Sequence, residues 1–485
     1  MALDPIVIIG GGFSGLGMGI RLKQAGIHDF VILEKSDGIG GTWWDNRYPG
    51  AACDIESHLY SFSFEPNPKW SRAFAPQPEI LQYLEHCADK YGLRPHLRLG
   101  TEATSAVFEE DHQRWRINTK RGDALLARML ISGTGGLSRP SLPDIPGLAD
   151  FTGKMFHSAR WDDSYSLDGK TVAVIGTGAS AIQIIPEIAL RVRQLSVFQR
   201  TPPWIMPKRD RALGSFEHQL FDRIPFAQKL ARTAQYWMHE LTAYGFVRNP
   251  ALLKLVSKLA QRYLEASVAD PVLRQKLAPQ YVMGCKRILL SNDYYPTISR
   301  SNVSLHTERI TRVERDGVRT ADGVLHKVDA IVLATGFSAA EVGAPFDVRG
   351  RGGVSLEDEW REGAEAYLGT AIAGFPNLFM IVGPNTGLGH SSMVFMIESQ
   401  VQYILDCVQW MERDQVRTVE VKPAAQQRFN EKLHARFPNT VWSSGCVSWY
   451  RTKHGKNTTL WPGLTLEFRL RTRRFDPTEY ALGSG

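Results

Sequence analysis

An α/β fold with two Rossmann-like domains, the second inserted in the first, and with an added helical insertion is predicted for this chain of 485 residues. Short apolar runs lead through glycine-rich turns into helical patterns twice, at 6–24 and at 171–189, and a further apolar run follows each pattern. Between 211 and 283, apolar residues recur at spacings of three and four among charged ones, which predicts amphipathic helices. The length alone favours two or three domains.

The first unit starts at the apolar run 6–9 and passes through Gly10, Gly12 and Gly15 before its helix begins. Such glycines let the backbone approach a pyrophosphate, whose charge the N-terminus of the helix stabilises. The next apolar run, in DFVILEK, ends at Glu34, where a carboxylate would accept hydrogen bonds from ribose hydroxyls. We therefore expect this unit to bind a dinucleotide.

The second unit, KTVAVIGTGASAIQIIPEI, repeats the arrangement at Gly176 and Gly178, with Ala181 as the third small residue. Arg200 follows Ala181 by 19 residues, and the acid of the first unit follows its own third small residue by the same 19. An acid repels a 2′-phosphate, whereas an arginine attracts one. We therefore assign FAD to the first unit and NADPH to the second; the alternative for Arg200 is an ordinary surface arginine.

Two more apolar runs lead into Thr-Gly turns, RMLISGTGG at 128–136 and VDAIVLATGF at 328–337, and we expect Thr335 and Gly336 to lie beside a cofactor. A plain tight turn is the alternative. The stretch NLFMIVGPNTGLGHSSMVF also has the pattern of strand, glycine turn and helix, so Asn385 joins the candidate cofactor residues, with the helix N-terminus facing the flavin.

The simplest layout divides the chain into five segments. The FAD domain occupies 1–145 and resumes at 331–485 together with a C-terminal segment, and the NADPH domain occupies 146–210, with a linker, and 284–330. The helical insertion occupies 211–283. For its helices, faces turned toward the core are favoured over a role at a membrane surface.

Composition excludes several classes of protein. With 43% hydrophobic and 22% charged residues and no run of about 18 uncharged apolar residues, the chain is expected to be globular and without an integral membrane segment. Its N-terminus lacks the marks of a secretion signal, and its five cysteines are scattered and without C-x-x-C, so we expect the cytoplasm, no disulfide framework and no metal site. The formal charge of +7 is dispersed, which favours a solvated basic surface over nucleic-acid binding. Nothing indicates an oligomeric state.

Two longer motifs carry a family resemblance. FTGKMFHSARWD, at 151–162, resembles the fingerprint F-x-G-x-x-x-H-x-x-x-W-[P/D] of type I Baeyer–Villiger monooxygenases, and the matching residues are Phe151, Gly153, His157, Trp161 and Asp162. GGTWWDNRYPGAACD resembles the family's second signature through Gly40, Gly41, Trp43, Tyr48, Pro49, Gly50 and Asp54. The resemblance extends over essentially the whole chain, including GCKRILLSNDYYP at 284–296 and SWYRTKHGKNTTLWPG at 448–463.

The resemblance implies an FAD-dependent NADPH monooxygenase that inserts one oxygen atom of O2 beside a ketone carbonyl, through a C4a-peroxyflavin, to give an ester or lactone. In the family, the arginine matching Arg287 stabilises the flavin peroxide anion, and the aspartate matching Asp54 positions that arginine. A guanidinium suits this role because its pKa exceeds about 12, so it stabilises an anion without protonating it. The alternatives are a structural salt bridge for Arg287 and a turn-capping role for Asp54.

The family also assigns contacts with NADPH to the residues matching Lys286, Arg200 and Thr201, and contact with the bound nicotinamide to the one matching Trp449. Together with the turn residues above, the expected cofactor-binding set includes Gly10, Gly12, Gly15, Glu34, Gly41, Thr42, Trp43, Tyr48, Asp54, Tyr60, Gly176, Gly178, Ser180, Ala181, Arg200, Thr201, Lys286, Thr335, Gly336, Asn385 and Trp449.

Two other functions stay open. A related flavin-containing monooxygenase would oxygenate the sulfur or nitrogen of a small substrate, and a non-catalytic NADPH-responsive protein would keep the fold alone. The Arg287–Asp54 pair favours the ketone reaction. Within the fingerprint, His157 could couple NADPH binding to a domain rotation or could pin the linker to the FAD domain, and the second is favoured.

Overall fold

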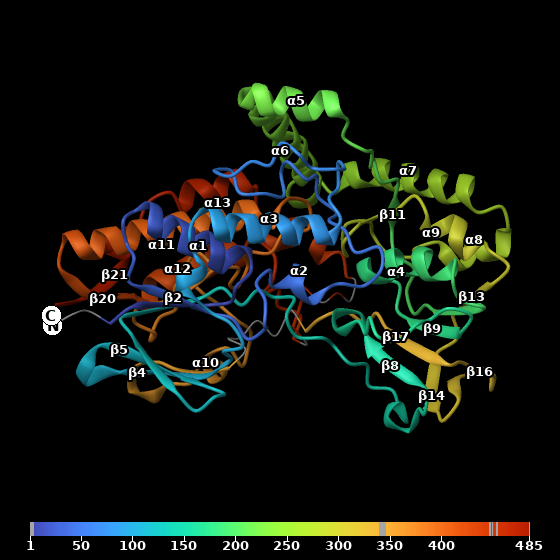
Figure 1. Cartoon of the computed structure of the whole chain (residues 1–485), viewed down its shortest axis with the longest axis horizontal. Helices are drawn as coiled ribbons and strands as arrows, with labels where there is room; N and C mark the ends of the chain where they lie inside the picture. Colours follow the sequence, from blue (N-terminus) through green and yellow to red (C-terminus); the bar gives the residue numbers. More distant parts are fainter. Residues whose placement is uncertain (1–3, 339–345, 446–447, 449, 453, 485) are drawn as a thin grey trace.

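Two parallel five-stranded sheets lie side by side and organise the protein (Figure 1). The computed structural model describes residues 4–338, 346–445, 448, 450–452 and 454–484, so the predicted cofactor residue Trp449 lies outside the described residues. The first sheet has the order β19 (Leu378–Met380), β7 (Met129–Ser132), β1 (Ile6–Ile9), β2 (Phe30–Leu33), β3 (Leu97–Arg98). The second has the order β13 (Val303–His306), β10 (Gln194–Phe198), β9 (Thr171–Ile175), β17 (Ala330–Leu333), β8 (Lys154–His157).

The first sheet is covered on both faces, as its uninterrupted apolar strands require. Helices α1 (Phe13–Gln24), α3 (Gln77–Lys90) and α11 (Met393–Arg413) lie on one face (Figure 1). On the other face lies a mixed sheet of β18 (Asp347–Arg349), β4 (Ala103–Glu109), β5 (Arg114–Thr119) and β6 (Ala124–Ala127), in which β18 pairs with β4 in parallel and the other pairs are antiparallel. Side chains of β1 therefore alternate between two separate apolar clusters.

The second sheet is inserted in the first. Its strands come from residues 154–333, whereas β19, which pairs with β7 in the first sheet, comes from residues 378–380. Helix α4 (Ala179–Ala189) follows the second glycine turn, as α1 follows the first. The remaining elements are α2 (Thr42–Asp45), β11 (Ile205–Met206), β12 (Leu289–Leu290), α9 (Tyr294–Ile298), α10 (Leu356–Glu359), β20 (Val416–Val421), α12 (Pro423–His434), α13 (Thr465–Arg471) and β21 (Tyr480–Ser484), with short 3-10 turns between them.

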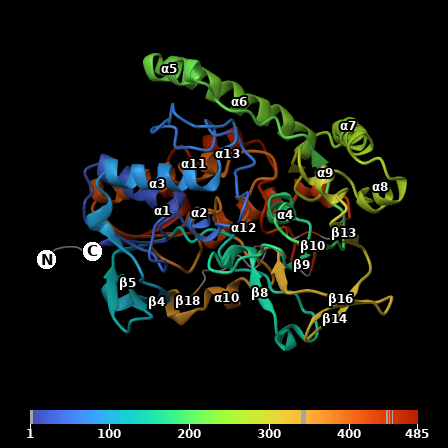
Figure 2. The same ribbon diagram turned by 45° about the vertical axis from the view of Figure 1, so that its right-hand side comes forward.

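Four helices form the insertion: α5 (Ser215–Arg223), α6 (Pro225–Val247), α7 (Ala251–Ser267) and α8 (Pro271–Leu277). In Figure 2, α5, α6 and α7 run along the edge of the molecule farthest from the sheets. Some of their apolar residues reach the core, among them Phe246 and Leu264, but many large ones are exposed. The expectation of faces turned toward the core is therefore wrong for a large part of α6 and α7. Within the described residues, no helix combines the length and the apolar character that crossing a bilayer requires.

The two chain segments that connect the domains pair with each other. Pro140, on the outgoing segment, and Phe337, on the returning one, form an isolated antiparallel bridge. Ser141 N donates to Gly336 O at 2.9 Å, and Ser338 N donates to Arg139 O at 3.1 Å. The domains are therefore joined by a two-stranded connection rather than by two independent linkers.

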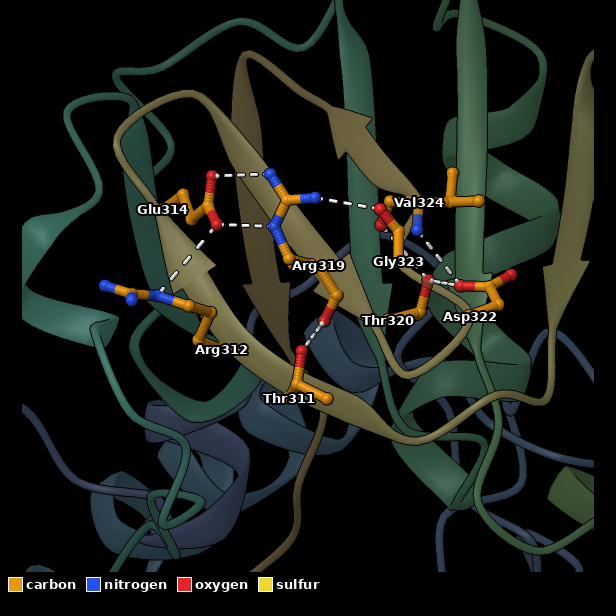
Figure 3. Close-up of polar contacts among 8 residues, drawn as sticks. All are labelled: Thr311, Arg312, Glu314, Arg319, Thr320, Asp322, Gly323 and Val324. Carbon is orange, nitrogen blue, oxygen red and sulfur yellow. Dashed lines mark hydrogen bonds and ion pairs between the residues drawn. The ribbon is translucent and has the colours of Figure 1, made fainter.

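A three-stranded antiparallel sheet of β14 (Ile310–Glu314), β15 (Gly317–Thr320) and β16 (Leu325–Lys327) extends the second domain. Figure 3 shows that its polar side chains bind one another: Arg319 donates to both carboxylate oxygens of Glu314, at 2.5 and 3.1 Å, and to Gly323 O at 2.8 Å. These charges have structural partners, so nothing in this sheet points to a ligand.

Candidate active site between two nucleotide turns

The two glycine turns are built alike. Gly10 and Gly176 both have a positive φ, 108° and 111°, which favours glycine. A Cβ at Gly10 would lie 2.6 Å from Gly133 O, and one at Gly176 would lie 2.4 Å from Ala334 O. Each turn therefore needs glycine because it packs against the chain that leaves a neighbouring strand.

The first turn is also packed against its own helix and against the second signature. A Cβ at Gly15 would lie 1.8 Å from Gly10 O, so the helix starts in direct contact with the turn. A Cβ at Gly12 would lie 3.4 Å from the Cα of Gly41, so two glycine backbones face each other there. This narrow, side-chain-free cradle fits the pyrophosphate of a dinucleotide.

Glu34 is directly after β2 and only 5% exposed. Its Oε2 accepts a hydrogen bond from Gly11 N at 2.7 Å, and its Oε1 accepts one from Ser36 N at 2.8 Å. A carboxylate has about four acceptor positions, so this one holds the turn and keeps lone pairs for ribose hydroxyls. An acceptor at this position fits the ribose of FAD, which carries no 2′-phosphate for the carboxylate to repel.

The prediction that Glu34 and Arg200 occupy equivalent positions at the ends of their strands is wrong. Glu34 N donates to Arg98 O, and the residue making the equivalent bond in the second sheet is Gln199, which donates to His306 O. Arg200 is therefore one residue beyond the position of Glu34. The physical reason is that the segment between the helix and the strand is one residue shorter in the second unit. Two residues at the same distance in sequence from their glycine turns therefore do not occupy equivalent positions in the two sheets.

Arg200 is nevertheless exposed beside the second turn, and it makes no hydrogen bond or ion pair with any described residue. The next residue, Thr201, accepts a hydrogen bond at its carbonyl oxygen from Thr177 Oγ1 at 3.2 Å. Burial lowers the pKa of Lys286, and the positive charge of Arg200 lowers it further. The Lys286 ammonium lies 4.9 Å from the centre of the Tyr281 ring. Neither cation has an acidic partner in the described structure, so both are available to an anion.

Arg287 and Asp54, 233 residues apart in sequence, form a bidentate ion pair. Arg287 Nε donates to Asp54 Oδ2 at 2.7 Å and Nη2 donates to Oδ1 at 2.8 Å. The carboxylate raises the pKa of Arg287 further above its ordinary value. Both side chains are about 30% exposed, at 31% and 30%, and Nη1 of Arg287 donates to no described residue. The pair therefore presents a fixed cation with donors still available.

Sequence reasoning missed His390, which lies near this pair. Burial lowers the pKa of His390 to about 3, with the charges of His239 and Arg287 acting in the same direction, so the ring is neutral. Neither of its ring nitrogens has a partner among the described residues. His390 stands in the quoted glycine-turn stretch, two residues before the N-cap Ser392 of α11, but a single histidine there carries no periodic signal.

Helix α6 is fastened to the same region by a second ion pair that sequence reasoning missed. His239 Nε2 and Glu56 Oε2 are 2.7 Å apart, and His239 Nδ1 contacts His390 O at 2.8 Å. Burial alone would lower the pKa of His239, but the hydrogen bond and charge of Glu56 outweigh it and raise that pKa. Burial alone would raise the pKa of Glu56, but the hydrogen bond and charge of His239 outweigh it and lower that pKa.

This pair predicts a pH-dependent stability. The raised pKa of His239 contributes stability that is present below its ordinary value of about 6.5 and is lost as pH rises through the raised value; the lowered pKa of Glu56 contributes stability that is lost at acid pH. We expect Glu56→Gln to lower the Tm by about 2 °C near pH 6, with a smaller difference at pH 9. Thermal unfolding of both proteins across pH measures this, and a constant difference would contradict it.

Tyr48 and Ser180, both predicted to bind cofactor, lie at one contact between the domains. The hydroxyl of Tyr48 donates to Gln183 Oε1 on α4 at 3.0 Å, and Ser180 on the same helix also hydrogen-bonds to Tyr48. Gln183 Nε2 donates to Ala52 O at 3.0 Å. The loop that leads to Asp54 is therefore held against the second domain.

The other predicted residues near the first turn lie close together. Trp43 Nε1 donates to the hydroxyl of Tyr60 at 3.3 Å, and the two rings meet edge to face with centroids 5.7 Å apart. Thr42 is exposed at the start of α2. These side chains border the cradle, and their contact with a cofactor stays a prediction.

Two predicted cofactor residues make structural hydrogen bonds. Asn385 Nδ2 donates to Asn457 O at 2.8 Å and to Leu460 O at 3.0 Å, and its buried Oδ1 has no partner in the described part of the chain. Thr335 Oγ1 donates to Ser141 O at 2.6 Å and so braces the connection between the domains. Only the Asn385 carbonyl oxygen is therefore left for a ligand.

The fingerprint stretch forms the edge strand β8 rather than a bare linker. A Cβ at Gly153 would lie 2.5 Å from Asp329 O and 2.6 Å from the Phe151 ring, so glycine is needed where β8 begins. Asp162 forms an ion pair with Lys154, at 2.5 Å, which lowers the pKa of Asp162 to about 2. Trp161 packs edge to face on Phe156, with centroids 4.9 Å apart. Most of the fingerprint is thus explained by the strand itself.

His157 is the exception. It is 5% exposed at the end of β8, where its Nδ1 accepts from Ala159 N at 3.1 Å. Burial lowers its pKa, although the backbone of Gly336 opposes this, and Nε2 makes no well-formed hydrogen bond with a described residue. Its ring centroid lies 5.9 Å from that of Phe337. His157 therefore contacts the returning connection between the domains.

The cysteines differ in state. Cys53, Cys87 and Cys407 are free and buried. Cys285, directly before Lys286, is disulfide-bonded, which the scattered cysteines of the sequence did not predict.

The site combines a cradle for one dinucleotide, a second glycine turn beside two cations, and a fixed arginine. This combination is typical of a flavoprotein oxidoreductase that uses a pyridine nucleotide. The family model described as pyridine nucleotide-disulphide oxidoreductase matches residues 7–214. A Baeyer-Villiger monooxygenase of Pseudomonas aeruginosa is 50% identical over 479 residues, which cover 98% of this chain and 91% of that protein. The chain belongs to the Baeyer–Villiger monooxygenase family.

Solved structures agree. OTEMO in complex with FAD and NADP has a TM-score of 0.89 at 30% identity, with 99% of both chains covered. Cyclohexanone monooxygenase from Rhodococcus sp. Phi1 bound to NADP+ has a TM-score of 0.89 at 31% identity, with 100% of both chains covered. The predicted family, fold class and enzyme class are confirmed: the protein is a flavoprotein monooxygenase.

Proposed function

We propose that this enzyme uses NADPH, O2 and bound FAD to insert one oxygen atom between the carbonyl carbon of a ketone and a neighbouring carbon, which gives an ester or lactone. The observation that carries the proposal is the bidentate Arg287–Asp54 pair, whose remaining Nη1 donors are free within the described structure. Membership of the family supports the same reaction.

The residues present fit both cofactors. FAD would be held by the glycine cradle of the first turn and by the Glu34 carboxylate, and NADPH by the turn at Gly176 and Gly178, with Arg200 and Lys286 on its 2′-phosphate. Bound FAD, once reduced, supplies the chemistry that activates O2. The protein supplies position and charge.

Arg287 acts on the substrate through charge. Its guanidinium stabilises the negative charge that develops on the carbonyl oxygen during oxygen insertion, and its raised pKa means that it does so without giving up a proton. Asp54 fixes the orientation of the guanidinium through two hydrogen bonds, so no reorientation is needed when charge develops.

The direct test is product analysis with purified protein, FAD, NADPH and oxygen-18 gas. A panel of cyclic, linear and aryl ketones plus one thioether is supplied, and mass spectrometry identifies labelled products. Labelled ester or lactone is the expected result. Labelled sulfoxide alone would assign heteroatom oxygenation instead, and hydrogen peroxide without labelled product across the panel would contradict oxygen insertion into these ketones.

Selectivity for NADPH depends on the exposed cations. We expect Arg200→Ala to raise the KM for NADPH about 10- to 100-fold, since one charge-assisted contact is lost, and to change the KM for NADH little. Arg193→Ala is the matched control because it removes an exposed arginine before the start of β10, whereas Arg200 follows its end. Equal loss for both nucleotides would contradict the assignment to the 2′-phosphate.

We propose that His157 couples the second domain to the connection between the domains, since its ring contacts Phe337. His157→Ala is expected to keep its FAD and to slow turnover several-fold, as for a residue that affects domain motion. FAD content by absorbance and steady-state rates measure the two effects. Lost FAD would show a folding role instead.

We place the enzyme in the cytoplasm. Three buried free thiols fit a reducing compartment, and the disulfide at Cys285 is the observation that opposes it. Thiol titration of protein captured under non-exchanging conditions decides: five reactive thiols on unfolding support the cytoplasm, and three contradict it.

A further inference from the structure

The outward face of α6 and α7 is apolar. Phe226, Leu230, Trp237 and Leu241 lie on one stripe of α6, at helical spacings of four, seven and four, and Leu255 and Leu259 lie on one stripe of α7. These six side chains are between 49% and 75% exposed. In Figure 2 these helices run along the outer edge of the molecule. We call these six residues the outward helical surface.

The opposite face of α6 is polar. Glu240, only 3% exposed, accepts from Thr465 N at 3.0 Å, and His239 pairs with Glu56. Arg232 donates to a backbone carbonyl oxygen of the first domain at 2.5 Å. Only the C-terminal end of α6 buries apolar side chains, Ala243, Phe246 and Val247; before it the helix turns polar groups inward and apolar groups outward, the reverse of an ordinary surface helix. Packing within this chain does not explain its apolar stripe.

The charged residues around the outward helical surface indicate which kind of partner it binds. Lys229, Arg248, Lys254, Lys258 and Arg262 are exposed among the apolar residues. Between 224 and 262 the only acidic residue is the buried, hydrogen-bonded glutamate of α6. Glu265, nearer the end of α7, is exposed as well, so the surface is apolar with cations outnumbering acids.

We propose that the outward helical surface docks on an anionic lipid bilayer, with α6 and α7 lying in the plane of the interface. Apolar side chains rimmed by lysine and arginine are what such helices present to lipid headgroups. A second copy of this chain is the weaker occupant, because a two-fold contact would bring the same cations face to face. No helix in the described structure is suited to span the bilayer, so the surface lies on it.

Vesicle co-sedimentation of the full-length holoenzyme tests the proposal. We expect binding to vesicles of phosphatidylglycerol and phosphatidylcholine, little binding to phosphatidylcholine alone, and release as ionic strength rises. The triple variant Lys254→Gln, Lys258→Gln, Arg262→Gln is expected to bind about a hundredfold more weakly, since each cation contributes about fivefold at an anionic surface.

A second variant removes the apolar part. Trp237→Ser with Leu241→Ser is expected to weaken binding at least about tenfold. The matched control, Leu190→Ser with Leu470→Ser, changes two leucines that are 68% and 62% exposed elsewhere, and it is expected to bind as the unchanged protein does. Because all these side chains are exposed, melting temperature and FAD content should be unchanged.

Three outcomes would overturn the proposal. They are no binding to anionic vesicles at low salt, equal binding by all variants, and a lipid-free dimer, seen by light scattering, that Trp237→Ser with Leu241→Ser dissociates. The last would assign the surface to a second copy of the chain. None of these measurements depends on catalytic activity, so they stand whether or not the ketone reaction is found.

Discussion

Arg287→Ala is expected to abolish ester formation while NADPH still reduces the flavin. The substitution removes the guanidinium that stabilises charge at the reacting oxygen, and removing a single such donor costs about 100- to 1000-fold in kcat. It leaves the glycine cradle and the cations at the second turn untouched. Anaerobic flavin bleaching by NADPH and aerobic product yield measure the two steps separately, and ester formation at an unchanged rate would remove Arg287 from the mechanism.

Arg287→Lys separates charge from geometry at the same position. Arginine makes two parallel hydrogen bonds to Asp54, at 2.7 and 2.8 Å, and still has oriented donors for the substrate. Lysine keeps the positive charge but cannot do both. We therefore expect a rate between those of the alanine variant and the unchanged enzyme. If lysine restored the full rate, charge alone would matter and the positioning role of Asp54 would be wrong.

The parts of the site that are local in sequence could be predicted from it. The strand, glycine turn and helix of each unit occupy about 20 consecutive residues, so spacing and residue type specify them. The structure adds what spacing does not contain: the first glycine of each turn packs against a carbonyl oxygen that follows a distant strand, Gly133 O or Ala334 O.

The parts that join distant segments needed the family resemblance or were missed. The Arg287–Asp54 pair spans 233 residues, and no local pattern connects its members. The counterpart of Glu34 was placed one residue too far along the chain, at Arg200, because register depends on how many residues link helix to strand. His239 and Glu56 each look like ordinary surface residues until α6 is folded against the first domain.

The helical insertion shows a different limit. Spacings of three and four identify an amphipathic helix and its apolar stripe, but they do not say which way the stripe faces. In α6 the buried polar residues Gln228 and Glu240 find partners inside the fold, and the apolar stripe is left outside. The partners of these polar residues, Asn67 and Thr465, are more than 150 residues distant in sequence, and periodicity alone does not contain such contacts.

Gly15→Ala is expected to have a larger effect than an added methyl group at any other glycine that the structure describes. Its Cβ would lie 1.8 Å from Gly10 O, a backbone atom of the turn that holds FAD, so the turn and α1 must separate. We expect loss of FAD and destabilisation by about 3 kcal/mol, as for severe overpacking.

The second turn provides the control because its third small residue is already Ala181, which is fully buried, and a Cβ at Gly178 would meet no atom within 4 Å. Gly178→Ala should therefore keep its FAD and its melting temperature, and should raise only the KM for NADPH, since the added methyl enters space that a pyrophosphate would occupy. The ratio of FAD to protein by absorbance, with thermal unfolding, compares the two variants. Full FAD content in Gly15→Ala would mean that α1 can move away from the turn, and that close contact between helix and turn is not what holds the flavin.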